Sequence, residues 1–126
     1  MNVALIANSI TMHERFNRDN IEILHSMGHN IFLISNGKVP VEVDKQLEQF
    51  YMYCSEKNIT IIDVRIPRSP FRLVNLIKAY FKLSIVAGNH RIDFIHSHSP
   101  SGGLLARILS HRIKIPNIYT AHGFHF

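Results

Sequence analysis

The sequence predicts a single α/β domain, an open parallel sheet with helices on both faces. Short apolar runs rich in β-branched residues alternate with longer helical patterns along the chain. These runs are continuous rather than alternating, which is typical of strands buried on both faces. With 126 residues, of which 46% are hydrophobic and 18% charged, the chain can form one core but has no room for a second full domain.

Five runs are predicted as strands: residues 3–7, 31–35, 59–64, 92–97 and 117–120. Right-handed crossovers and the doubly wound pattern predict the strand order 3-2-1-4-5, which is Rossmann-like. This order reverses direction between the first and the fourth strand. Ligands of such sheets bind at this switch point, beyond the carboxyl ends of the strands.

Two helices are expected in the first half of the chain. The first begins at Thr11, which can form a capping box with Glu14, and ends at Gly28. The second spans about residues 43–57. Its predicted buried stripe consists of Val43, Leu47, Phe50 and Cys54.

Two further helices are expected in the second half. The third follows Pro70 and ends near Gly88, and the fourth begins at Ser101. The fourth is predicted to direct four apolar residues towards the sheet: Leu104, Leu105, Ile108 and Leu109.

Composition limits the compartment and the partners. The 14 lysines and arginines exceed the 9 acidic residues, so the net charge of +5 favours anionic partners such as phosphates or phospholipid headgroups. A lone cysteine, Cys54, excludes a disulfide framework. No apolar run approaches the roughly 18 residues of a membrane span, and the N-terminus resembles a strand rather than a signal peptide. A cytoplasmic location with at most peripheral membrane contact is expected.

Polar residues are concentrated where the predicted strands end. Asn8 and Ser9 follow the first strand, His98 follows the fourth, and His122 follows the fifth. His96 and His98, two apart at a strand end, should point to the same side, and each could bind a ligand or a neighbouring backbone group. A zinc site made of His96, His98, His122 and His125 is disfavoured, because no cysteine or carboxylate completes a known spacing.

Small residues begin the predicted fourth helix at Ser101, Gly102 and Gly103. They could leave amide groups open to an anion at the positive end of the helix dipole. Close packing of the helix on a strand explains the two glycines equally well.

The third helix and its approach combine cations with apolar residues. Its cations are Arg65, Arg68, Arg72, Lys78 and Lys82, interleaved with Phe71, Val74, Phe81 and Ile85. This mixture is typical of a helix at a membrane interface, and it also fits burial against a helix or domain outside this chain.

Residues 93–103 and 119–126, which contain these histidine motifs, resemble the N-terminal domain of family 4 glycosyltransferases, the retaining GT-B enzymes. Residues 28–31 and 66–71 are also similar, especially to bacterial capsule and exopolysaccharide members. The resemblance implies that residues 1–126 form an incomplete N-terminal, acceptor-side domain and that a donor-binding C-terminal domain is absent. The parent enzyme would then transfer a sugar from a nucleotide-sugar donor to an acceptor, with retention of configuration.

The resemblance also implies roles for individual residues. His122 would contact the transferred sugar as the catalytic residue, and Asn8, Ser9 and His98 would border the substrate cleft together with Ser101, Gly102 and Gly103. The membrane-facing or acceptor-facing residues would be Arg68, Arg72, Lys78 and Lys82. The loop after the first strand lacks the glycine pair that many relatives place near the donor phosphates.

The implied partners are a nucleotide sugar, a glycan or lipid-linked acceptor in cell-surface polysaccharide synthesis, and an anionic membrane, but not nucleic acid. No metal or other cofactor is expected. The chain alone would be inactive and would self-associate through exposed apolar surface. The alternatives are a non-catalytic subunit that pairs with a separate donor-binding chain, a sugar-nucleotide epimerase of the same architecture, and an unrelated Rossmann-like binding module.

Overall fold

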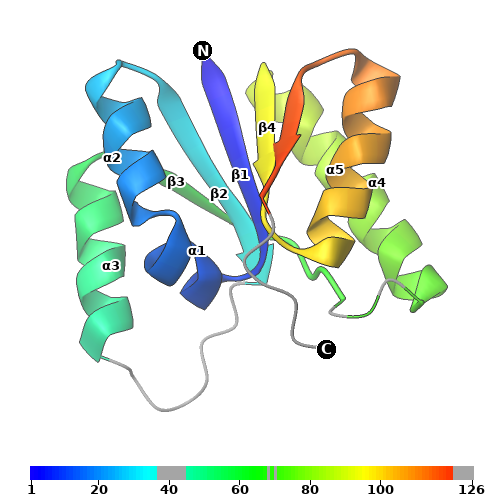
Figure 1. The fold of residues 1–126 in the computed structure, drawn as a ribbon, viewed down its shortest axis with the longest axis horizontal. Helices are drawn as coiled ribbons and strands as arrows, with labels where there is room; N and C mark the ends of the chain where they lie inside the picture. The colour runs from blue at the N-terminus through cyan, green and yellow to red at the C-terminus, as the bar shows by residue number, and fades with distance from the viewer. Residues whose placement is uncertain (37–44, 68, 70, 121–126) are drawn as a thin grey trace.

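The computed structural model describes residues 1–36, 45–67, 69 and 71–120 (Figure 1). A five-stranded parallel sheet forms its centre, with the order β3-β2-β1-β4-β5. The predicted fold class and strand order are therefore confirmed. The strands are β1 (Asn2–Ser9), β2 (Asn30–Asn36), β3 (Thr60–Asp63), β4 (Phe94–Ser97) and β5 (Asn117–Tyr119).

Five helices cover the two faces of the sheet (Figure 1): α1 (Ile10–Phe16), α2 (Arg18–Ser26), α3 (Lys45–Glu56), α4 (Leu73–His90) and α5 (Pro100–Ile113). Successive residues of a strand point to opposite faces, so β1 contributes to two cores. Val3 and Leu5 pack with residues of α1, α2 and α3, whereas Ala4 and Ile6 pack with residues of α4 and α5. Both faces of β1 are therefore buried, as its continuous apolar run indicates.

The predicted first helix is two helices. Ser9, not Thr11, is the N-cap of α1, and it makes no side-chain capping bond, so the expected capping box does not form. The break falls at Asn17, which ends α1 and precedes α2. Gly28 does follow the second helix, at φ +84°, where a left-handed turn favours glycine.

A buried polar contact lies at the break at Asn17. His13 and Asn17 are both completely buried. His13 Nε2 donates to the backbone oxygen of Ile34, 3.1 Å away, and Nδ1 accepts from the Asn17 side-chain amide at 2.8 Å. The two helices are thus fixed to β2 by a histidine whose ring nitrogens both have partners.

The second predicted helix is α3, and its stripe is largely confirmed. Leu47, Phe50 and Cys54 are buried, while Val43 lies outside the described residues. Burial raises the pKa of the Cys54 thiol to about 11, and the nearby Arg18 opposes this only in part.

The later helices differ from prediction in two details. α4 continues past Gly88 to His90, because Arg91 adopts the left-handed conformation that ends it. In α5, Leu105 and Leu109 are buried, but Leu104 and Ile108 are 41% and 48% exposed. Ala106 and Gly102 complete the buried side instead, because small residues let α5 approach β1 closely.

Gly102 and Gly88 provide a matched test of this close approach. A Cβ added at Gly102 would lie 2.6 Å from Ser99 Oγ and 3.3 Å from Ile6 Cγ2, whereas nothing lies within 4 Å at Gly88. We expect Gly102→Ala to lower the free energy of unfolding by about 1–3 kcal/mol. Gly88→Ala should raise it by about 0.5–1 kcal/mol, because alanine favours an exposed helix. Urea denaturation measures both, and equal effects would contradict the packing described.

His13 should make the stability depend on pH. Burial lowers its pKa from 6.5 to about 4, although the hydrogen bond to Ile34 raises it in part. Below pH 6.5 the unfolded chain binds a proton at His13 that the folded chain excludes. The contribution of neutral His13 to the free energy of unfolding is therefore complete above pH 6.5 and is lost as the pH falls towards 4. We expect a loss of about 2 kcal/mol between about pH 7.5 and about pH 5.

The control for this prediction is His13→Gln, which keeps a donor and an acceptor but cannot titrate. Its free energy of unfolding should fall by about 2 kcal/mol less than that of the original chain over the same range. Identical pH profiles in chemical denaturation would show that His13 does not cause the dependence.

Candidate functional site

Three of the four polar residues predicted at the switch point, Asn8, Ser9 and His98, lie at that end of the sheet. Asn8 and Ser9 end β1, and His98 follows β4, which pairs with β1 through Ile6 and Ser97. The His98 backbone amide donates to the Ile6 carbonyl oxygen at 2.9 Å, which extends the pairing beyond the strand. We call Asn8, Ser9, His98 and Ser99 the switch-point cluster.

Ser99 holds this cluster together. Its hydroxyl donates to Asn8 Oδ1 at 2.8 Å and accepts from the Gly102 amide at 3.1 Å, as the N-cap of α5. A serine followed by proline at the first helical position is a recognised helix start, so the sequence contained this signal. One buried hydroxyl therefore fixes the end of β1 relative to the start of α5.

His96 and His98 lie on the same side, as predicted. Their ring centroids are 4.1 Å apart, with an interplanar angle of 35°. His96 Nε2 lies 2.7 Å from Thr120 Oγ1, so this ring also contacts the residue that follows β5. His98 is buried, at 2% exposure, while His96 is half-buried. Each imidazole ring offers hydrogen-bonding nitrogens at this end of the sheet.

The start of α5 is closely packed. Ser101 and Gly102 are buried. The Gly102 amide bonds the Ser99 hydroxyl, and the Gly103 amide bonds the Ser99 carbonyl oxygen. A Cβ at Gly103 would lie 2.7 Å from the Tyr119 ring. Close packing thus accounts for both glycines, and these two amides already have acceptors.

The remaining predicted residues are either outside the described part of the chain or at a separate cavity. His122 and Arg68 are outside the described residues. Arg72, Lys78 and Lys82 line a separate cavity between α4 and the segment after β3. Asn36 and Asn75 line the same cavity but could not be predicted from the sequence, because single asparagines carry no pattern.

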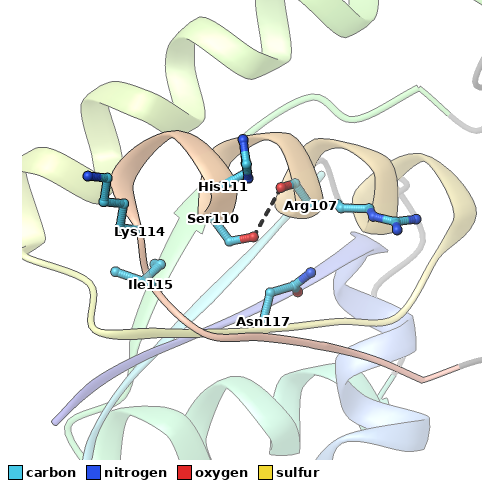
Figure 2. Close-up of a pocket in the computed structure, with 6 residues that line it drawn as sticks. All are labelled: Arg107, Ser110, His111, Lys114, Ile115 and Asn117. Carbon is cyan, nitrogen blue, oxygen red and sulfur yellow. Dashed lines mark hydrogen bonds between the residues drawn. The ribbon is translucent and has the colours of Figure 1, made fainter.

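A further pocket of about 540 Å³ lies between α5 and β5, with Ser110 and Asn117 on facing sides (Figure 2). Its cations Arg107 and Lys114 lie in the second half of α5 or at its end. Lys114, the C-cap of α5, complements the negative end of the helix dipole, which gives it a structural role away from the switch point.

The described side chains were also compared with the requirements of a metal site. Within the described ranges, no three histidine, cysteine or acidic side chains are grouped as metal ligands would be. His122 and His125, which the zinc alternative requires, lie outside those ranges.

Among the described helices, none combines the length and the apolar character needed to span a bilayer.

Comparison with known proteins identifies the family. Residues 13–126 match the model of Glycosyltransferase Family 4. EpsD of Bacillus subtilis (strain 168), which is named as a glycosyltransferase, is 34% identical over 105 residues. The match covers 79% of this chain but only 23% of EpsD, so the chain spans less than a quarter of that relative.

Solved structures show the same fold at low identity. A glycosyltransferase from Rickettsia africae ESF-5 matches with a TM-score of 0.68 and 12% identity, over 98% of this chain and 30% of that one. MurG of Acinetobacter baumannii matches with a TM-score of 0.62 and 17% identity, over 98% and 36%.

The fold alone does not indicate a function, because a deacetylase of teicoplanin biosynthesis also reaches a TM-score of 0.68, at 7% identity over 93% of this chain and 68% of its own. The family model is more specific, since it covers most of the sequence, including His98 and Ser99 after β4. On that match, the chain belongs to glycosyltransferase family 4.

Proposed function

We propose that the complete protein is a retaining glycosyltransferase that moves a sugar from a nucleotide-sugar donor to an acceptor, and that this chain forms the acceptor side. The observation that carries the proposal is the switch-point cluster, within a chain that matches the family over residues 13–126. Its side chains offer donors and acceptors suited to sugar hydroxyl groups. They lie where open α/β sheets bind ligands.

Within this proposal, Asn8, Ser9 and His98 border the bound sugar or acceptor. Ser101, Gly102 and Gly103 fix the start of α5 beside them, because they are small and closely packed. His122 contacts the transferred sugar near the reacting carbon. The transfer uses no metal, and the charge that develops is stabilised by hydrogen bonds.

The chain by itself is proposed to be inactive, with the donor bound mainly by another part of the protein. Its share of EpsD, 23%, supports this division. The edge strand β5 exposes Ile118 at 52% and Tyr119 at 44%, which also favours self-association or pairing with a separate donor-binding chain. That pairing is the second candidate function.

A lipid-linked acceptor in cell-surface polysaccharide synthesis is proposed because of α4. Six large apolar residues on or next to this helix are more than half exposed: Phe71, Leu73, Val74, Ile77, Phe81 and Ile85. Arg72, Lys78 and Lys82 lie among them. An apolar surface bordered by cations suits an anionic bilayer, so we place the protein peripherally on the cytoplasmic face of the plasma membrane.

His122→Ala in the complete enzyme tests the catalytic role. One hydrogen bond that strengthens in the transition state is worth about 3–4 kcal/mol, so turnover should fall roughly a hundredfold to a thousandfold. The thermal midpoint should change little, since a side chain used only in transfer stabilises the fold weakly. Turnover near that of the unchanged enzyme would refute the role, and joint loss of turnover and stability would make His122 structural.

Vesicle flotation tests the membrane proposal. Phe71→Ser combined with Phe81→Ser removes two exposed rings and should weaken binding to phosphatidylglycerol vesicles by about tenfold or more. Met52→Ser on α3, where the side chain is 64% exposed, is the matched control and should have no effect. Neutralising Arg68, Arg72, Lys78 and Lys82 should also weaken binding, by about 1 kcal/mol for each cation near the surface. Equal binding to neutral and anionic vesicles would count against the proposal.

A further inference from the structure

The cavity that Arg72, Lys78 and Lys82 line lies at the carboxyl edge of the sheet, away from the switch point. It has a volume of about 520 Å³, within the roughly 300–1,000 Å³ of small-molecule sites. The end of β2, the segment after β3 and the first half of α4 surround it. We call it the α4 pocket, and its polar lining residues are Asn36, Arg65, Arg72, Asn75, Lys78 and Lys82.

The charged residues that line the α4 pocket in the described part of the chain all have one sign. Four of these lining residues are cations, and no carboxylate is among them. Its apolar lining residues Val64, Ile66 and Ala79 are buried, at 0%, 4% and 3% exposure. An apolar wall lowers the local dielectric and strengthens the attraction between the cations and an anion.

The spacing on α4 directs three of these side chains together. Asn75, Lys78 and Lys82 are separated by three and four residues, which places them on one face of a helix. Like charges at this spacing repel each other, so an anion between Lys78 and Lys82 relieves the repulsion.

Arg72 is placed unfavourably for the helix itself. It is the N-cap of α4, its side chain makes no capping bond, and the first turn contains no acidic residue. A cation at this end opposes the helix dipole, whereas Lys114 of Figure 2, at the end of α5, complements the dipole of its helix. The dipole therefore explains Lys114 but not Arg72, and a bound anion would compensate both Arg72 and the positive end of α4.

From this combination we infer that the α4 pocket binds a phosphate or diphosphate group. Arg65 and Arg72 have the planar fork that matches phosphate oxygens in pairs, while the two lysines add point charges and the asparagines add amide donors. The inference rests on the proposed function in one respect, which is that the phosphorylated molecule is the acceptor. The affinity for phosphate follows from the pocket alone.

The test is calorimetric titration of the chain with inorganic pyrophosphate at low and raised salt. Saturable binding with one site per chain is expected, and it should weaken as salt rises. Lys78→Gln should weaken it about tenfold, because a charge-assisted contact is lost. Asn75→Asp, which puts a negative charge at the rim, should weaken it at least as much.

Arg107→Gln is the matched control, because it removes one exposed cation from α5 in the pocket of Figure 2. It should leave pyrophosphate binding unchanged. Circular dichroism should show that all variants remain folded, since the substituted side chains are exposed. Absence of saturable binding, or equal weakening by Lys78→Gln and Arg107→Gln, would overturn the inference.

Vesicles distinguish the two sources of the phosphate. One set carries an isoprenyl diphosphate in phosphatidylcholine, and the other carries phosphatidylglycerol at equal surface charge. Preference for the first set, removed by excess inorganic pyrophosphate and by Lys78→Gln, supports a lipid-linked ligand. Pyrophosphate binding with no such preference supports a free phosphorylated ligand.

The flotation and calorimetric results test the membrane proposal and this inference separately. Loss of flotation in the Phe71→Ser, Phe81→Ser variant, with pyrophosphate binding retained in solution, assigns the apolar surface to the membrane and the pocket to phosphate. Flotation without any pyrophosphate binding would leave the membrane proposal standing and reject the phosphate pocket.

Discussion

The fold depends on the burial of β1 on both faces. Residues 3–7 of this strand are all buried, and β1 pairs in parallel with β2 on one side and β4 on the other. Parallel pairing needs a crossover for every strand, so helices must cover both faces. The chain first regains polar side chains at Asn8 and Ser9, where β1 leaves the core. The switch-point cluster is therefore a direct result of how the central strand is buried.

The sheet could be predicted from the sequence because the signals for it are local. A continuous apolar run marks each strand, and handedness rules restrict the order of the strands. Helix ends depended on contacts distant in sequence and were less accurate. Nothing around Asn17 indicates that His13 will reach the Ile34 carbonyl oxygen, and the left-handed Arg91 replaces the glycine expected at the end of α4.

The candidate site could be predicted in part for the same reason. The order of the strands alone brings Asn8, Ser9 and His98 together, so those three followed from topology. Ser99 could not be assigned its role without the distance from its hydroxyl to Asn8 Oδ1. The α4 pocket combines residues from three elements, and only the folded chain shows that Asn36 and Asn75 join its cations. The two sites share the carboxyl edge, which would suit an acceptor that reaches from phosphate to sugar.

The burial of Cys54 has a practical consequence. It is the single cysteine of the chain, its side chain is 1% exposed, and its thiol stays protonated at neutral pH because its pKa is about 11. Thiol reagents attack the thiolate, so the folded chain offers them almost no native target. A cysteine introduced at an exposed position of α4, such as Ile85, would accept a fluorophore or spin label alone. Spectroscopic reporters can thus be attached without first replacing a native residue.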